Sequence, residues 1–271
     1  MRIYIENGKE IDQLVPEEEA KQGDIVIYEV LRIIDRVPLF TDDHFSRYLN
    51  SCALMNVNSL ISEADFLGQL SCLIERNELT GGNVKVELLT RSSGEQRLRM
   101  FIIPHQYPSE SDYVNGVRVG LLEAVRQNPR VKVVQSLVRT RANQAIADNN
   151  WYEVLLIDES GEITEGSRSN VFFVRNGLFY TAPACKVLAG VTRKKIKECI
   201  SALGFQCLEE AIATEDLPTI DAAFISGTSP KILPIASIAG QPLQVEDRRL
   251  RLLMKEFDVL ISDYIEKRKK P

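Results

Sequence analysis

The spacing of apolar positions changes several times in the first hundred residues. Apolar residues that alternate with polar ones predict β-strands, whereas apolar residues three and four positions apart predict helices. These patterns predict strands at 2–5, 25–34, 37–40, 84–90 and 97–103, and helices at 41–54 and from 62 to just before 81. A Thr or Asp within 41–43 is expected to cap the first helix. Strands and helices mix without strict alternation, which favours an α+β domain.

The texture of the chain changes after residue 104. Residues 105–116 contain Pro108, Asn115 and Gly116 and are interpreted as a linker. Beyond them, strands are predicted at 117–122, 131–134, 153–158, 171–174, 178–180 and 222–225, and helices at 140–149, 192–203 and 247–266. The sequence therefore predicts an α+β fold of two domains. A small α+β domain is expected at 1–104, and a β-rich domain with peripheral helices at 117–271.

Composition narrows the class of protein. The chain has 271 residues, of which 44% are hydrophobic and 26% are charged, and its formal net charge is −5. This acidic balance argues against a nucleic-acid surface, and the basic residues at 267–270 are expected to form a solvated, frayed end. No apolar run approaches the roughly 20 residues of a membrane span, and the start lacks the apolar stretch of a signal peptide. We therefore expect a cytoplasmic protein with no membrane or nucleic-acid partner.

The cysteines and histidines do not indicate a metal site. The five cysteines form no C-x-x-C pair, and the two histidines, His44 and His105, are far apart in sequence. These spacings argue against a structural zinc site, and we expect no metal. An odd number of widely spaced cysteines fits reduced thiols in the cytosol.

One stretch, EITEGSRSNVFFVRNGLFY at 162–180, combines an acid with a predicted hairpin. Glu165 precedes small polar residues and is expected on a turn. Asn176-Gly177 is a typical signal of a tight turn between two strands. An acid on such a turn can be directed at a ligand. A glutamate that faces solvent is the alternative.

Three places could bind a phosphate group. A glycine-bearing loop precedes Val191 and Thr192 at a predicted helix start, where backbone N–H groups and a partial positive charge favour an anion. The Gly-Thr-Ser turn that contains Thr228 offers further N–H groups. Arg47 lies on a predicted helix, and a guanidinium can bind phosphate oxygens at two points. The alternatives are a helix start that caps itself, an ordinary β-turn and a surface arginine.

Lys132 lies in a run of β-branched residues at 131–134 and, on a strand, would share a face with Val134. In an apolar interior the charged form of a lysine is disfavoured, and its amine becomes nucleophilic. The outward face of an edge strand is the alternative. Pyridoxal phosphate would use all these groups, because it needs a lysine for a Schiff base, a phosphate site and an acid at its pyridine nitrogen.

Four motifs in the chain resemble those of one family. They are HFSR at 44–47, TEGSRSNVF at 164–172, GVTR at 190–193 and ISGTSP at 225–230. Together they resemble the class IV aminotransferases, pyridoxal-phosphate enzymes of fold type IV that include branched-chain aminotransferase, D-amino acid aminotransferase and aminodeoxychorismate lyase. The resemblance extends over nearly the whole chain. It implies a two-domain fold like that of D-amino acid aminotransferase, a homodimer, and an amino acid and a 2-oxo acid as substrates.

The resemblance also implies roles for individual residues. Lys132 would form the Schiff base. Its separation from Glu165 (165 − 132 = 33) is similar to the family's separation between that lysine and the acid at the pyridine nitrogen. Tyr28 falls where the family places an aromatic residue beside the substrate. The residues that resemble the family's phosphate contacts are Arg47, Val191 through its backbone, Thr192 and Thr228.

The chain departs from the family pattern in two places. Branched-chain aminotransferases have Asn-Tyr where this chain has Ser136 and Leu137, and the Tyr contacts the cofactor's phenolic oxygen. The D-amino acid enzymes bind the substrate carboxylate with Arg-x-His, where this chain has Arg97 and Arg99. These two arginines share a strand face, and either could bind a substrate carboxylate; surface charges are the alternative. The Asn-Arg pair of the lyases is absent unless Arg139 takes its place.

The first hypothesis for function is therefore a pyridoxal-phosphate-dependent aminotransferase that acts on a branched-chain or related amino acid. The second is a lyase that releases 4-aminobenzoate and pyruvate from aminodeoxychorismate. A protein that binds the cofactor without turnover is the third hypothesis. The fourth is a protein whose Gly-Thr loops bind a different phosphate.

Overall fold

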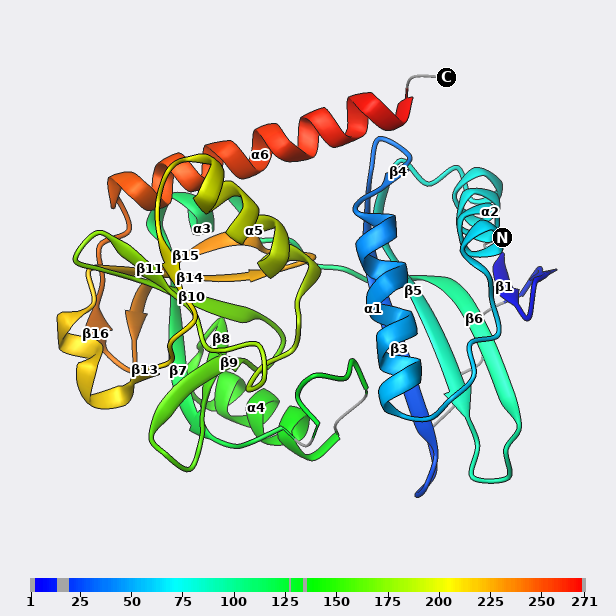
Figure 1. The fold of residues 1–271 in the computed structure, drawn as a ribbon, viewed down its shortest axis with the longest axis horizontal. Helices are drawn as coiled ribbons and strands as arrows, with labels where there is room; N and C mark the ends of the chain where they lie inside the picture. The colour runs from blue at the N-terminus through cyan, green and yellow to red at the C-terminus, as the bar shows by residue number, and fades with distance from the viewer. Residues whose placement is uncertain (1–2, 14–19, 127, 134–135, 270–271) are drawn as a thin grey trace. The chain divides into compact units, whose positions relative to one another are not determined.

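The chain folds into two units (Figure 1). The computed structural model describes residues 3–13, 20–126, 128–133 and 136–269. The first unit comprises Met1–Gln106, Val131–Val134 and Ile261–Pro271, and the second comprises Tyr107–Arg130 and Gln135–Leu260. Neither unit is contiguous in sequence. The domain boundaries expected at 104 and 117 stay a prediction, and the interval between them holds helix α3 (Glu110–Asn115).

The first unit is built on a six-stranded antiparallel sheet with the strand order β2-β1-β6-β5-β3-β4. The strands are β1 (Tyr4–Glu6), β2 (Lys9–Ile11), β3 (Ile25–Ile34), β4 (Val37–Pro38), β5 (Gly81–Thr90) and β6 (Gln96–Ile103). β3 pairs with β5 along its whole length. Apolar residues on one face of the sheet form the core together with α1 (Thr41–Leu54) and α2 (Glu63–Arg76). The alternating pattern predicted β3 because the residues of one of its faces are buried from Ile27 to Ile33.

The two helices of this unit begin in different ways. Ser62 caps α2, and its hydroxyl accepts the backbone N–H of Asp65 at 3.2 Å. The prediction that Thr or Asp caps α1 is wrong, because Thr41 is already the first helical residue. The residue before it, Phe40, has a left-handed backbone (φ 54°) and makes no side-chain cap. The hydroxyl of Tyr264 instead accepts the Thr41 N–H at 3.2 Å.

Tyr264 belongs to the long C-terminal helix α6 (Arg248–Lys269). Its ring meets that of Phe40 edge to face, with 5.1 Å between the centroids. One turn later, Arg268 donates to both carboxylate oxygens of Asp42 at 2.9 Å, and Lys269 pairs with Asp35 at 3.1 Å. The expectation of a frayed basic end is therefore wrong as far as Lys269, and Lys270 lies outside the described residues.

The second unit is built on a ring of strands. Its strands are β7 (Val117–Glu123), β8 (Glu153–Ile157), β9 (Glu162–Gly166), β10 (Asn170–Arg175), β11 (Leu178–Tyr180), β12 (Cys207–Leu208), β13 (Ile212–Ala213), β14 (Ala222–Gly227), β15 (Lys231–Ile238) and β16 (Gln241–Pro242). The strands pair in the order β10-β14-β15-β7-β8-β9, and a further pairing of β9 with β10 closes the ring. The closed ring removes open sheet edges along this path.

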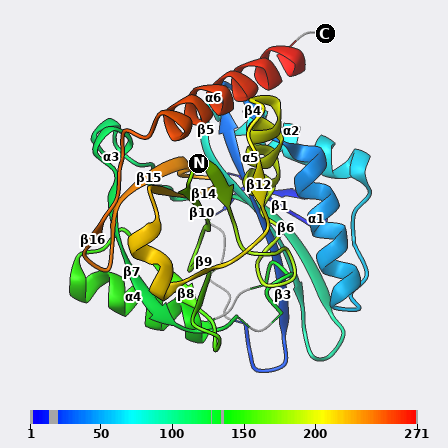
Figure 2. The same cartoon turned by 60° about the vertical axis from the view of Figure 1, so that its left-hand side comes forward.

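Helices cover the outside of this ring in both views of the structure (Figures 1 and 2). α4 (Ser136–Asn149) packs on β7 and β8, the parallel pair that it connects, and α5 (Val191–Ala202) packs on β14. A short 3₁₀ helix, η1 (Thr214–Thr219), precedes β14. The rings of Phe172 and Phe224, on β10 and β14, stack with their centroids 4.9 Å apart. The ring interior is filled by the opposite faces of these strands, for example by Val171 and Ile225.

The hairpin predicted at Asn176-Gly177 is confirmed. Asn176 and Gly177 have φ values of 51° and 83°, and β10 pairs with β11 from Arg175 opposite Leu178 onward. Two consecutive left-handed residues make the two-residue turn whose twist suits a hairpin. By contrast, β15 was not predicted. It contains Pro234, which cannot donate a hydrogen bond to a strand ladder and therefore argues against a strand.

Two features are absent from the part of the chain that the structure describes. None of its helices is long and apolar enough to cross a membrane. No group of three or more His, Cys, Asp or Glu side chains among the described residues could hold a metal ion.

Replacement of Tyr264 by Phe tests the contact that starts α1. We expect the Tyr264→Phe variant to lower the free energy of unfolding by about 1 kcal/mol, because the Thr41 N–H loses its acceptor as in the removal of a helix cap. Denaturant titration of both proteins measures the difference. Tyr152→Phe, at a partly exposed tyrosine in the second unit, is the matched control. Equal effects of the two variants would show that the Tyr264 hydroxyl does not stabilise α1.

Candidate active site

Glu165 is buried on a strand rather than placed on a turn. It lies in β9, opposite Asn170 of β10, and is 2% exposed. The expectation of a turn is wrong because β9 extends to Gly166, and the turn begins only at Ser167. Arg126 donates to one carboxylate oxygen of Glu165 and the backbone N–H of Leu188 donates to the other, both at 3.1 Å. These two donors fix the orientation of the carboxylate.

The small residues after Glu165 bind a second acid. The hydroxyls of Ser167 and Ser169 and the backbone N–H of Arg168 all donate to the carboxylate of Glu153. Glu153 is the first residue of β8 and is 4% exposed. Its contacts hold the turn at 167–169 in place between β9 and β10. Glu153 was not predicted from the sequence, although an acid at the start of a buried strand is a signal of such a role.

Val191 and Thr192 form the first turn of α5, as predicted. Gly190 precedes them as the N-cap, without a side-chain cap. A Cβ atom on Gly190 would lie 2.1 Å from the Asn170 side-chain oxygen, so this close approach requires glycine. The amide nitrogen of Asn170 donates to the Leu188 carbonyl at 3.0 Å. Asn170 therefore fixes the loop that leads into α5.

The same loop connects the acid with the helix start. Leu188 donates its N–H to Glu165, and the helix begins three residues later. β14 runs beside β10, with Ser226 opposite Asn170, and Thr228 follows directly after the strand ends at Gly227. The structure thus brings Glu165, the start of α5 and the end of β14 together at one edge of the ring. This edge combines a fixed carboxylate with the N–H groups of a helix start.

In the first unit, Lys132 lies beside Tyr28. The strand predicted at 131–134 is wrong, since Val133 makes a single bridge to Ile27 and Lys132 lies outside any strand; Val134 is not among the described residues. The backbone N–H of Tyr28 donates to the Lys132 carbonyl at 3.1 Å. The Lys132 ammonium lies 4.6 Å from the centre of the Tyr28 ring. These contacts attach the lysine segment to β3.

Arg47 is not a surface residue. It lies on α1, is 9% exposed and forms a two-point contact with Glu29 of β3, from Nε to Oε1 at 2.8 Å and from Nη2 to Oε2 at 2.5 Å. Nδ1 of His44 lies 2.7 Å from Oε2 of the same carboxylate. Glu29 has no exposed surface. Glu29 was not predicted from the sequence, although an acid within the apolar row of β3 is a signal of such a residue.

Burial and charge act in opposite directions on this cluster. Burial raises the pKa of Glu29, but the charge and hydrogen bonds of Arg47 and the hydrogen bond of His44 outweigh it and lower the pKa to about 2. Burial also lowers the pKa of His44, against the opposing effect of Glu29. At neutral pH the carboxylate is therefore ionised and the imidazole is neutral.

The two arginines of β6 differ in their surroundings. Arg99 is 4% exposed and pairs with Glu87, the residue opposite it on β5, and Glu87 also pairs with Lys85. Tyr28 is opposite Glu87 on the other side, so Tyr28, Glu87 and Arg99 form one row across three strands. Arg97 pairs with Glu95 at 3.3 Å, on the turn between β5 and β6, where the glutamate side chain is 63% exposed.

The predicted site residues thus form two groups. Tyr28, Arg47, Arg97, Arg99 and Lys132 belong to the first unit, and Glu165, Val191, Thr192 and Thr228 belong to the second. One of the two places at which the chain departs from the family pattern, residues 136–139, lies at the start of α4. Leu137 is 82% exposed and Arg139 is exposed, whereas the side chain of Ser136 lies outside the described part of the chain.

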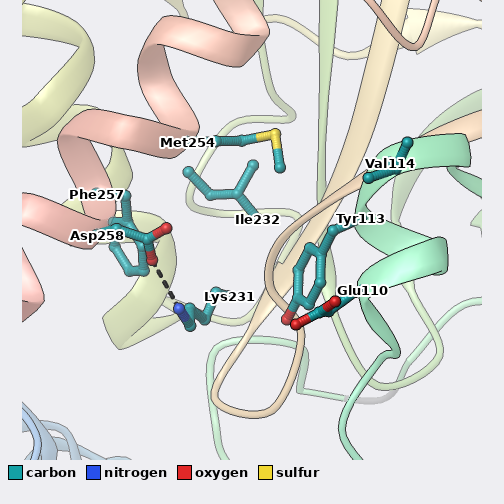
Figure 3. Close-up of a pocket in the computed structure, with 8 residues that line it drawn as sticks. All are labelled: Glu110, Tyr113, Val114, Lys231, Ile232, Met254, Phe257 and Asp258. Carbon is teal, nitrogen blue, oxygen red and sulfur yellow. Dashed lines mark hydrogen bonds and ion pairs between the residues drawn. The ribbon is translucent and has the colours of Figure 1, made fainter.

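A pocket of about 390 Å³ lies elsewhere in the second unit (Figure 3). It is lined by Glu110, Tyr113, Val114, Lys231, Ile232, Met254, Phe257 and Asp258. An ion pair of 2.6 Å between Lys231 and Asp258 lies along one wall. None of the predicted site residues lines this pocket, so it is separate from the candidate site.

Comparison with known proteins identifies relatives over most of the chain. The D-alanine aminotransferase of Bacillus licheniformis is 27% identical over 229 residues, which cover 80% of each chain. A putative branched-chain-amino-acid aminotransferase of Methanocaldococcus jannaschii is 27% identical over 266 residues, which cover 89% of each chain. Both are relatives in sequence to which this chain is similar.

Solved structures share the fold. The branched-chain amino acid aminotransferase of Escherichia coli superposes with a TM-score of 0.85 at 18% identity and covers 96% of this chain and 94% of its own. A putative 4-amino-4-deoxychorismate lyase of Legionella pneumophila gives a TM-score of 0.76 at 19% identity and covers 88% and 91%. These similarities confirm the expected α+β fold of fold type IV.

The family assignment rests on a match that includes most of the candidate site. The family model described as amino-transferase class IV matches residues 26–238, a range that contains Tyr28 at its start and Thr228 near its end. Because this match spans more than half of the 271 residues, the chain belongs to the class IV aminotransferases, whose cofactor is pyridoxal 5'-phosphate.

Proposed function

We propose that this protein is an aminotransferase that moves an amino group from an amino acid to a 2-oxo acid. The observation that carries this proposal is the connection of Glu165 to the start of α5 through the Leu188 loop. The segment from Leu188 to Val191 thereby orients the Glu165 carboxylate, which could bind a pyridine nitrogen. It also leads into the start of α5, which could bind a phosphate. The relatives named as D-alanine and branched-chain aminotransferases support the same reaction class.

The residues of the second unit fit pyridoxal phosphate. Glu165 offers a carboxylate of fixed orientation, and the start of α5 offers backbone N–H groups together with the Thr192 hydroxyl. A phosphate dianion is stabilised at such a helix start by the N–H groups and by the helix dipole. Thr228 would add a hydroxyl from the end of β14. Arg47, in the first unit, would supply the guanidinium contact.

The chemistry that the bound cofactor supplies is an electron sink for the bonds at the substrate α-carbon. Lys132 would attach the cofactor and then move the proton at that carbon, acting as a general base and acid. The Tyr28 ring, 4.6 Å from the lysine ammonium, limits the directions in which the amine can point. Glu165 would hold a proton at the pyridine nitrogen through its fixed carboxylate.

Arg97 fits a substrate carboxylate better than Arg99 does. Arg99 is nearly fully buried and bound to Glu87, so its release would leave a buried carboxylate with one fewer partner. Arg97 pairs with an exposed glutamate, Glu95, and exposed ion pairs contribute little free energy. Loss of the Glu95 pair would therefore cost little free energy if Arg97 bound a substrate carboxylate. In this proposal Arg99 holds Glu87 in the row beside Tyr28.

A lyase that releases pyruvate from aminodeoxychorismate is the second candidate. It is kept because Leu137 stands where branched-chain aminotransferases have a tyrosine, which weakens the branched-chain assignment, and because a protein named as a putative lyase shares the fold. A homodimer in the cytoplasm stays a prediction for either enzyme.

Removal of Lys132 tests its covalent role. We expect Lys132→Ala to lose the absorption band of the lysine-bound cofactor and to lower kcat/KM by at least about 100-fold, because the variant lacks both the attachment point and the proton-transferring amine. Lys9→Ala, at an exposed lysine of β2, is the matched control and should retain both. An unchanged band in the Lys132 variant would rule out this lysine.

A substrate panel separates the two candidate reactions. With an aminotransferase, a single amino acid without any 2-oxo acid should bleach the band of the lysine-bound cofactor, since the first half-reaction needs no acceptor. The absorbance is followed for L- and D-amino acids in parallel. Formation of pyruvate from aminodeoxychorismate without an acceptor, with no bleaching by any amino acid, would favour the lyase instead.

A further inference from the structure

The first unit contains an ionised side chain in an otherwise apolar row. Successive residues of β3 on the face toward α1 are Ile27, Glu29, Leu31 and Ile33, and none of them is more than 1% exposed. A carboxylate without solvent costs several kcal/mol unless it is paired with a positive charge and hydrogen-bonded. At this position a valine or leucine would complete the core. The presence of Glu29 is therefore explained if it positions a positively charged side chain.

The partner of Glu29 is Arg47, and the contact fixes a plane. Nε and Nη2 of the guanidinium each bind one carboxylate oxygen, at 2.8 and 2.5 Å. A two-point contact determines both the position and the direction of the planar group, which a single ion pair does not. His44 lies three residues before Arg47, on the same side of α1, and its Nδ1 binds Oε2 at 2.7 Å. The histidine thus keeps the carboxylate from rotating.

The charges of this cluster cancel at neutral pH. Glu29 is ionised, Arg47 is positive and His44 is neutral, for the reasons given by their surroundings. A phosphate bound at Arg47 would therefore be held by directed N–H donors and not by a net charge of this cluster. Glu29 takes the edge of the guanidinium that carries Nε and Nη2, so Nη1 lies on the opposite edge. The Glu29 carboxylate thus orients the Arg47 guanidinium.

The same strand also positions the lysine. Tyr28 precedes Glu29, and successive residues of a strand point to opposite faces. On its own face Tyr28 contacts Lys132, through its backbone N–H and through its ring. Two consecutive residues of β3 therefore hold Lys132 and Arg47.

We propose that Glu29 is a positioning residue that orients Arg47 for the phosphate of the cofactor. This inference rests on the proposed function, in which Arg47 is a phosphate contact. Glu29 itself touches neither the cofactor nor the substrate in this proposal. In this proposal it acts on cofactor binding through Arg47, at the phosphate end.

Binding of two forms of the cofactor tests the proposal. Apoprotein is titrated with pyridoxal phosphate and, separately, with pyridoxal, which lacks the phosphate, and binding is followed by absorbance. We expect Glu29→Gln to weaken binding of pyridoxal phosphate by about tenfold or more, the effect of losing a hydrogen bond to a charged group. Binding of pyridoxal should stay within about twofold of the unchanged protein, because no phosphate is involved.

One further variant is a control, and another is a second test of the proposal. Asp24→Asn removes a carboxylate of the same unit that pairs with Arg91 at 2.6 Å, and it should change neither titration. Glu29→Asp keeps the charge but shortens the side chain by one methylene group, so the two-point contact is lost while the ion pair is retained. If Glu29→Gln does not fold, the aspartate variant carries the test and should still weaken pyridoxal phosphate alone.

A double variant separates failure of this inference from failure of the proposed function. If Glu29 acts through Arg47, then Glu29→Gln combined with Arg47→Lys should bind pyridoxal phosphate no more weakly than Arg47→Lys alone. Weakened binding in Arg47→Lys but not in the Glu29 variants would overturn the positioning role and leave the phosphate contact intact. Unchanged binding in Arg47→Lys would overturn the phosphate contact itself. Equal weakening of both cofactor forms by Glu29→Gln would show a structural role only.

Discussion

The first unit depends on the neutralisation of one buried carboxylate. Glu29 lies between the sheet and α1, with no exposed surface, and is stable there only because Arg47 and His44 reach it from α1. These contacts determine which side of α1 faces the sheet, because Arg47 and His44 must both face β3. The start of the same helix is held by Tyr264, from the other end of the chain. Local sequence therefore forms α1, and distant residues orient it.

In the second unit, a close contact between the Asn170 side chain and the backbone fixes the loop before α5. Asn170 binds the Leu188 carbonyl and occupies the space beside Gly190, so the loop into α5 can follow one path only. Along that path Leu188 donates its N–H to Glu165. Two hydrogen bonds thus link Glu165, the loop and the start of α5, and the lack of a side chain at Gly190 makes room for Asn170. Pairing of β9 with β10 closes the ring and supplies the rigid frame for this link.

Regular patterns predicted the elements that one buried face defines. β3, β5, β6, α2 and the hairpin of β10 and β11 lie where alternation, helical spacing and Asn-Gly placed them. Predictions failed where a distant contact decides the local structure. The Thr41 N–H is bound by Tyr264, and β15 tolerates Pro234 within the ring. The Lys132 segment is not a strand of its own and lies beside β3 through the bridge between Val133 and Ile27 and the hydrogen bond from Tyr28.

The sequence by itself determined the family, the α+β class and the residue types for a pyridoxal-phosphate enzyme, because motifs and periodicity are local properties of the chain. Only the tertiary structure showed that Glu165 lies on a strand with Arg126 and Leu188 as its partners, and that Arg47 is bound to Glu29. The partner of an acid in an apolar row cannot be predicted from the row itself, because the partner lies on another element. The physical reason is that a charge can be buried only after folding brings the opposite charge to it.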